Sequence, residues 1–231
     1  MRILVTVLTA AATLSAVEPP AVFTASHAKA DFALTANPNN TPWKQVKPLR
    51  AAMDPFGKPA GEGNAFEFRT LWTNENLYFL FTCPYESLNL KPNPSATEET
   101  NKLWDWDVTE IFAGSDFENI TRYQEFQVSP QGEWVDLDID RVKPLPEGGW
   151  KWNSGMKVMA RVDKEKKIWY GEMKIPMRSI DKREPKAGNE LRLNLYRLTG
   201  VAPNRRSTMW TPVHQRSHHT PEAFGRMVLG R

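Results

Sequence analysis

The chain has 231 residues, and its 30 Lys and Arg against 27 Asp and Glu give a formal net charge of +3. Because both signs are interspersed along the chain, the sequence offers no basic groove for nucleic acid. Cys83 is the only cysteine, which excludes an internal disulfide and predicts a monomer that folds without one.

The first 30 residues have the pattern of a secretory signal peptide. Met1 and Arg2 precede an uncharged run from Ile3 to Val17, and residues 28–30 fit the small-x-small cleavage rule. An earlier cut after Ala25 is the alternative. The apolar run is too short for a membrane span, so we expect a secreted or periplasmic mature chain without one. Residues 31–231 then form a single domain.

From residue 66 onward, apolar and polar residues alternate at a period of two, which is typical of half-buried strands. The pattern predicts strands at 66–73, 77–83, 108–113, 123–128, 135–140, 156–162, 167–175, 190–198 and 224–229. Loops rich in Gly, Pro and polar residues separate many of them. With few helical periods, the fold class is all-β: an antiparallel β-sandwich of about nine or ten strands with long loops.

Within the central stretch, alternation predicts which side chains share a face of the sheet. Val108, Glu110 and Phe112 lie on one face, and Thr109 and Ile111 lie on the other. The next strand divides in the same way, with Tyr123, Glu125 and Gln127 opposite Gln124, Phe126 and Val128.

Several motifs carry a resemblance to a known family. Residues 103–112 read Leu-Trp-x-x-Asp-Val-x-Glu-Ile-Phe, residues 123–132 read Tyr-x-Glu-Phe-x-Val-Ser-Pro-x-Gly, and residues 169–176, 193–197 and 224–228 fit the same pattern. The chain resembles the carbohydrate-binding family 9-like domains, which are related more distantly to DOMON-type sandwiches. The resemblance covers roughly residues 66–229 and implies a secreted, non-catalytic domain that binds a poly- or oligosaccharide.

The resemblance also implies where a sugar would bind. Family 9 modules clamp a terminal sugar between two Trp rings, and Trp104 and Trp210 match these rings by their places in the chain. Exposed indoles suit the C–H face of a sugar ring because they offer a large rigid contact. Further ligand-binding candidates are the other tryptophans in or beside loops and one arginine: Trp106, Trp150, Trp152 and Arg197. Trp134 and Trp169 lie within strands and are expected in the core.

Aspartates near these motifs suggest a metal site. Asp105, Asp107 and Asp136 could supply the oxygen ligands that Ca²⁺ requires. The resemblance implies a structural Ca²⁺, since modules of the family often carry one. His214, His218 and His219 match no zinc-site spacing, and we expect them in a solvated loop.

Two alternatives remain open. One is a haem-binding or electron-transfer sandwich, for which Met156, Met159, Met173, Met177, Met209 and His214 are the candidate ligands. The other is a polysaccharide hydrolase, which needs two carboxyl groups flanking the scissile bond.

Overall fold

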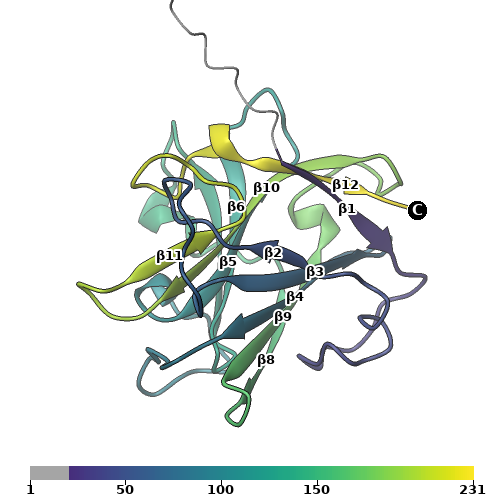
Figure 1. The fold of residues 1–231 in the computed structure, drawn as a ribbon. Helices are drawn as coiled ribbons and strands as arrows, with labels where there is room; N and C mark the ends of the chain where they lie inside the picture. Colours follow the sequence, from purple (N-terminus) through teal and green to yellow (C-terminus); the bar gives the residue numbers. More distant parts are fainter. Residues whose placement is uncertain (1–20) are drawn as a thin grey trace, which may run out of the picture.

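The computed structural model describes residues 21–231, and the strands in this range build an all-β domain (Figure 1). The first six strands are β1 (Val22–His27), β2 (Leu49–Ala51), β3 (Phe66–Trp72), β4 (Asn76–Pro84), β5 (Val108–Gly114) and β6 (Arg122–Val128). The other six are β7 (Trp134–Asp140), β8 (Lys157–Asp163), β9 (Ile168–Pro176), β10 (Glu190–Thr199), β11 (Arg206–Met209) and β12 (Gly225–Leu229).

Four short 3₁₀ helices in the same range connect strands: η1 (Leu103–Asp105), η2 (Pro146–Gly149), η3 (Met177–Ser179) and η4 (Pro221–Ala223). Each is a single turn. None of the helices in residues 21–231 has the length and apolarity that crossing a membrane requires.

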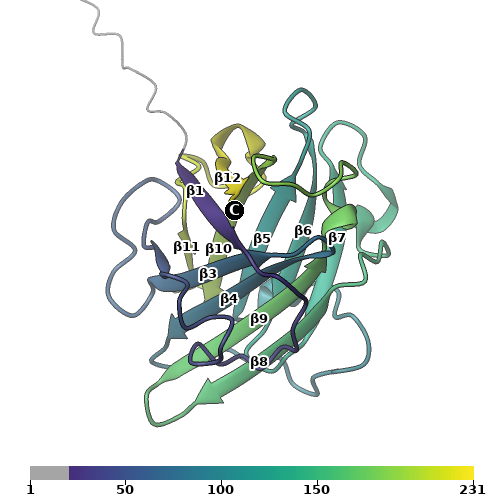
Figure 2. The ribbon, with the colours of Figure 1, turned by 90° about the vertical axis from the view of Figure 1, so that its right-hand side faces the viewer.

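The strands form two packed layers, which Figure 2 shows from the side. We call the first layer the β5–β10 layer; its order is β7-β6-β5-β10-β12, with β11 beside β10. We call the second the β4–β9 layer; its order is β3-β4-β9-β8, with β2 beside β3. β1 joins them, since Val22 to Ala25 pair with β12 and Ser26 and His27 pair with β3.

Two features correct the sequence-based expectations. The described residues hold twelve strands instead of nine or ten, and β1 runs parallel to both neighbours in an otherwise antiparallel arrangement. β2 has three residues and β11 has four, which is too short for alternation to be recognised. β1 lies within the predicted signal peptide, whose residues 1–20 fall outside the described part of the chain.

The core between the layers confirms the predicted faces. Ile111, Phe126 and Leu195 from the β5–β10 layer meet Phe79 and Trp169 from the β4–β9 layer, and all five are 0% exposed. Alternate residues of the same strands therefore point away from the core. In particular, the face of the β5–β10 layer that carries Glu110 and Glu125 lies on the outside of the sandwich.

The outer face of the β4–β9 layer is covered by the segment that follows β1. Trp43, 1% exposed, packs there with Tyr78 and Leu80. The carboxylate of Glu172 accepts hydrogen bonds from the indole of Trp43 at 2.7 Å and from two backbone amides, those of residues 35 and 36. This covering segment anchors a buried carboxylate that would otherwise be costly.

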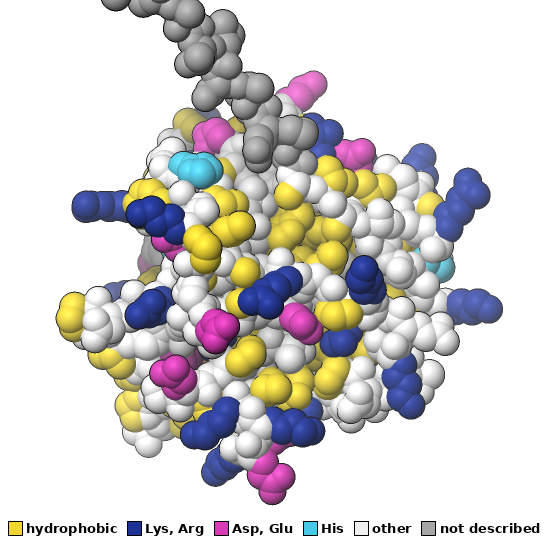
Figure 3. Space-filling view, viewed as in Figure 1, with side chains coloured by type: hydrophobic (Ala, Val, Ile, Leu, Met, Phe, Trp, Pro, Cys, Tyr) yellow, Lys and Arg dark blue, Asp and Glu magenta, His cyan; other side chains and the backbone are white. Residues whose placement is uncertain are grey.

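Charged side chains form no single-sign patch on the face shown in Figure 3, where Lys and Arg side chains are dispersed with Asp and Glu among them. This agrees with the interspersed charges of the sequence.

Candidate functional site

A cleft of about 880 Å³ lies over the outer face of the β5–β10 layer. Its floor comes from β5, β6, β7 and β10, and its walls come from η1, η2 with the turn before it, the start of β11 and the loop before η4. The residues lining the cleft include Trp104, Glu110, Phe112, Glu125, Leu198, Arg205, His218 and His219.

Two buried glutamates form the polar part of the floor. Glu110 on β5 is 2% exposed and Glu125 on β6 is 4% exposed. The side-chain amide of Gln127 lies between them, and its nitrogen donates to Oε1 of Glu110 at 2.9 Å and to Oε1 of Glu125 at 2.5 Å. One amide group thus fixes one oxygen of each carboxyl group, and the second oxygens stay on the cleft side.

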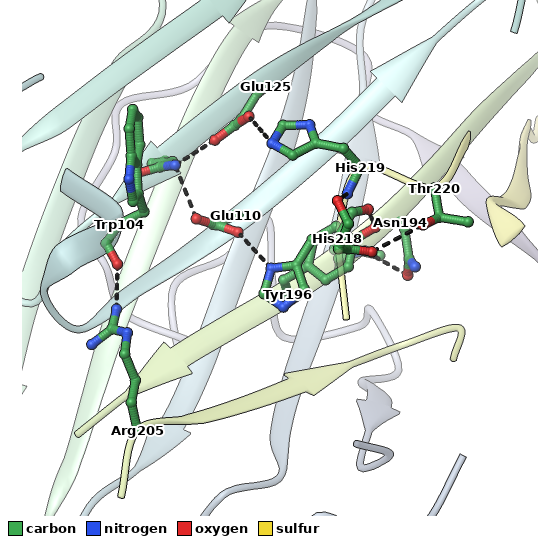
Figure 4. A network of polar contacts seen from close by, with 12 residues as sticks. Trp104, Glu110, Glu125, Asn194, Tyr196, Arg205, His218, His219 and Thr220 are labelled. Carbon is green, nitrogen blue, oxygen red and sulfur yellow. Dashed lines mark hydrogen bonds and ion pairs between the residues drawn. The ribbon is translucent and has the colours of Figure 1, made fainter. Parts of the chain in front are cut away.

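Two histidines from the loop before η4 close one side of the floor (Figure 4). The His218 ring stacks on Tyr196, with centroids 5.1 Å apart, and the His219 ring stacks on Phe112 at 4.9 Å. Nδ1 of His219 lies 2.7 Å from the hydroxyl of Tyr123. Aromatic residues of the sheet therefore hold both imidazoles over the glutamates.

Burial decides the protonation of this group. It raises the pKa of Glu125 to about 8 and, together with the neighbouring Glu125, raises that of Glu110 well above its ordinary value. Burial also lowers the pKa of His218 and of His219 to about 4. Each histidine nitrogen lies 4.0 Å from a glutamate Oε2. Because both histidines are neutral at pH 7 and the distance is long, these contacts are not ion pairs.

Trp104 forms the wall beside this floor. It lies in η1, which is anchored by the fully buried Leu103. The guanidinium of Arg205 donates to the backbone carbonyls of Trp104, of Trp106 at 2.7 Å and of Gly200 at 2.7 Å. Arg205 therefore fixes the turn that presents the Trp104 side chain to the cleft.

The structure does not form the predicted clamp of Trp104 and Trp210. Only Trp104 lines the cleft. Trp210 lies on the inner side of the sheet, with its ring centroid 5.0 Å from that of Phe23 and 6.3 Å from that of Phe68. Its ring also contacts the backbone of Gly225, where a Cβ atom would clash with it. Trp210 lies in a loop, where the sequence shows no period-two alternation, so the sequence could not assign its side chain to the cleft or to the core.

The other predicted ligand-binding residues are also dispersed. Trp106 does not line the cleft, and Trp150 packs, partly buried, against the apolar cluster around Leu137 and Leu198. Trp152 packs near Phe126 and lines a different groove. Arg197 is 1% exposed and donates to the carbonyls of residues 63–65 and 84. It joins loops instead of facing a ligand.

The three aspartates proposed as metal ligands serve separate contacts. Asp107 accepts hydrogen bonds from the amides of residues 89 and 200, and Asp136 accepts from Ser154 at 2.6 Å. Asp105 is exposed at the edge of the cleft. Across residues 21–231, no three His, Cys, Asp or Glu side chains are arranged to hold a metal ion.

The candidate ligands of the haem alternative are largely core residues. Met156, Met173 and Met177 are at most 3% exposed and pack between the two layers, and Met209 is buried in a second apolar cluster. Met159 and His214 are exposed.

Sequence reasoning missed part of the site. Period-two alternation already grouped Glu110 with Phe112 on one strand and Glu125 with Gln127 on the next. The structure confirms both groups, and its strand register places them on the same face. Alternation does not indicate that no other segment of the described chain covers this face. His218 and His219 were expected in a solvated loop, and no local pattern shows that they fold onto aromatic residues far away in the chain.

Comparisons with known proteins agree with this fold. The family described as "Carbohydrate family 9 binding domain-like" matches residues 38–231. A putative carbohydrate-binding protein from Bacteroides uniformis superposes with a TM-score of 0.67 at 12% identity, over 90% of this chain and 98% of that one. No curated protein matches the sequence.

Two structures of a family 9 carbohydrate-binding module from Caldicellulosiruptor kristjanssonii are also similar. The glucose complex superposes with a TM-score of 0.65 at 13% identity, over 91% of this chain and 96% of that one. The cellotriose complex gives 0.66 at 14%, over 91% and 94%. At these identities the solved structures show a shared fold. The match to the family model covers residues 38–231, which is most of the chain. The chain therefore belongs to the carbohydrate family 9 binding domain-like family.

Proposed function

We propose that this protein is a non-catalytic carbohydrate-binding domain that takes a saccharide unit into the cleft over the β5–β10 layer. The observation that carries the proposal is the combination of an indole wall, Trp104, with a polar floor, Glu110 and Glu125, inside one cleft. Sugar rings need both kinds of surface, since their C–H faces pack on aromatic rings and their hydroxyls need hydrogen-bond partners.

The asymmetry of the two layers supports this choice of site. The outer face of the β4–β9 layer is covered by the chain after β1, and its buried carboxylate, Glu172, already accepts three hydrogen bonds. On the outer face of the β5–β10 layer, Glu110 and Glu125 share a single donor. Unused hydrogen-bonding capacity therefore lies on the open face, where a ligand can meet it.

A binding role also fits the chemistry of the two glutamates better than hydrolysis does. A retaining or inverting glycosidase needs one carboxylic acid and one carboxylate on opposite sides of the scissile bond. Glu110 and Glu125 lie side by side on neighbouring strands, and burial raises the pKa of both. These raised pKa values disfavour the ionised partner that the reaction requires.

We also propose that the protein is exported and acts as a monomer outside the cytoplasm. The uncharged run from Ile3 to Val17 supports export. Because β1 belongs to the sandwich, a cut after Ala25 or Ala30 would divide or remove it. In this proposal the cut falls before Ala21, and N-terminal sequencing of the exported protein tests it.

The binding proposal is tested on the purified domain with a glycan array, followed by calorimetry on the sugar that binds best. Replacing Trp104 by Ala should weaken the affinity about tenfold or more, as removal of a central aromatic contact does. Trp106→Ala is the matched control, because its side chain lies outside the cleft, and it should keep the affinity. Equal affinities for both variants, or release of reducing sugar by the unchanged protein, would contradict the proposal.

A further inference from the structure

We propose that the saccharide bound in the cleft is an amino sugar, whose protonated amine is held between the carboxyl groups of Glu110 and Glu125. This inference rests on the proposed carbohydrate-binding function and specifies its ligand. It follows from how the two carboxyl groups are paired and which charges surround them.

The two carboxyl groups present unused oxygens to the cleft. The side chains are 3% and 5% exposed, and both residues line the cleft. Gln127 occupies both Oε1 atoms, while neither Oε2 atom has a hydrogen-bond partner among the described residues. Both Oε2 atoms therefore face the same open space, where a ligand can supply their hydrogen-bond donors.

No cation of the described chain neutralises this pair. The positive charge of Arg205 lowers the pKa of Glu110, but its guanidinium donates to three backbone carbonyls and forms no ion pair with either glutamate. Arg141 lies at the exposed edge of the cleft, and its positive charge contributes to lowering the pKa of His219. His218 and His219 are neutral because burial lowers their pKa values to about 4. A positive charge that pairs with these carboxyl groups once they ionise must therefore come from the ligand.

Aromatic rings stand beside both carboxyl groups. Tyr196 pairs in register with Glu110, and Phe112 pairs in register with Glu125. The stacked rings of His218 and His219 cover the faces of Tyr196 and Phe112. The ligand therefore meets the two carboxyl groups and neutral imidazoles, and the carboxyl groups are what hold the amine.

The edge of the cleft limits the ligand to one amine at the floor. Basic and acidic residues both occur there: Lys102, Arg141, Arg206 and Arg216 against Asp105, Asp138, Asp140 and Glu147. A polycationic chain would meet these basic residues, so the edge does not select it. The cleft of about 880 Å³ has room for a sugar unit beside Trp104. A single amino-sugar unit at a chain end satisfies both conditions.

Binding of an ammonium group must be linked to loss of a proton. With Gln127 donating to the Oε1 atoms, any carboxyl proton in the free protein resides on an Oε2 atom, facing the cleft. The incoming N–H⁺ takes the place of that proton, which leaves to solvent. Affinity should therefore rise with pH until the amine itself loses its charge.

The test is isothermal titration of the full chain with glucosamine, glucose and N-acetylglucosamine at pH 7, in two buffers of different ionisation enthalpy. We expect glucosamine to bind at least tenfold more tightly than glucose and to release a proton, and acetylation to abolish this preference. Glu110→Gln and Glu125→Gln should each lose the preference for glucosamine over glucose. Glu184→Gln is the control, because it makes the same substitution in an exposed side chain outside the cleft.

Each outcome is decisive. Glucose binding that equals or exceeds glucosamine binding in the unchanged protein overturns this inference and leaves the proposed function standing. Failure of every sugar to bind overturns both. The three-ligand comparison needs no variant, so it decides the question even if a Gln substitution disturbs folding, which the thermal midpoint of each variant will show.

Discussion

Removing β1 should unfold most of the domain. The perturbation is a chain that begins at Asp31, compared with one that begins at Ala21. The shorter chain lacks Phe23, which is 7% exposed and lies with its ring centroid 5.5 Å from that of Phe68 and 5.0 Å from that of Trp210. Truncation of a buried Phe costs about 3 to 5 kcal/mol in other cores.

The deletion also removes backbone hydrogen bonds. The carbonyls of Ala21 and Ala25 accept from Arg226 at 2.8 Å and Gly230 at 2.7 Å, besides the strand pairing of β1 itself. Each such bond contributes about 0.5 to 1.5 kcal/mol. Together with the loss of Phe23, the cost exceeds about 5 kcal/mol, which is comparable with the whole stability of a typical domain.

The assay is unfolding in guanidinium chloride, followed by tryptophan fluorescence. Two point variants separate the loss of packing from the shortening of the chain. Phe23→Ala should lower the free energy of unfolding by about 3 to 5 kcal/mol. Val22→Ala, at a neighbouring side chain that is 58% exposed, should change stability by less than about 0.5 kcal/mol. If the chain starting at Asp31 unfolds within about 1 kcal/mol of the longer one, β1 is no part of the stable fold and the reasoning fails.

Three further outcomes are expected. Trp210→Ala should cost about 3 kcal/mol of unfolding free energy without changing sugar affinity, since its ring packs against Phe23; a selective loss of affinity would contradict its place in the core. The pKa of Glu125 rises from 4.5 to about 8 on folding, so between these pH values the folded state binds more protons than the unfolded state. The stability of the free protein should therefore fall as the pH rises from 4.5 to about 8. In thermal melts at several pH values, Glu125→Gln should show a smaller fall. Burial raises the pKa of Cys83 to about 12, so a thiol reagent should label Cys83 only after unfolding. Labelling of the folded protein would contradict the burial of this thiol.

Strand periodicity predicted the frame of the fold because it depends only on neighbours two residues apart. The nine long strands and the division of Glu110 and Ile111 between faces follow from it. The short strands β2 and β11 were not predicted because they contain too few residues to show a period. β1 escaped for a different reason, since its sequence is equally compatible with the end of a signal peptide.

The site was harder to predict because its residues are separated along the chain. His219 stacks on Phe112, more than a hundred positions earlier, and the loop carrying it has no regular pattern. The tryptophans misled in a different way. Position in a loop suggested exposure for Trp104 and Trp210 alike, yet Gly225 leaves room for one ring to pack inside the sandwich. Local sequence cannot distinguish these two environments.

Burial alone does not distinguish a structural carboxyl group from a binding one in this fold; the number of hydrogen-bond donors does. Glu172 is 0% exposed and accepts three hydrogen bonds from the segment that covers its layer. Glu110 and Glu125 are nearly as buried, yet they share one amide and keep two oxygens toward a cleft. The first arrangement is complete within the chain and stabilises it. The second keeps two acceptors open to the cleft, where a ligand can supply the donors that the chain does not.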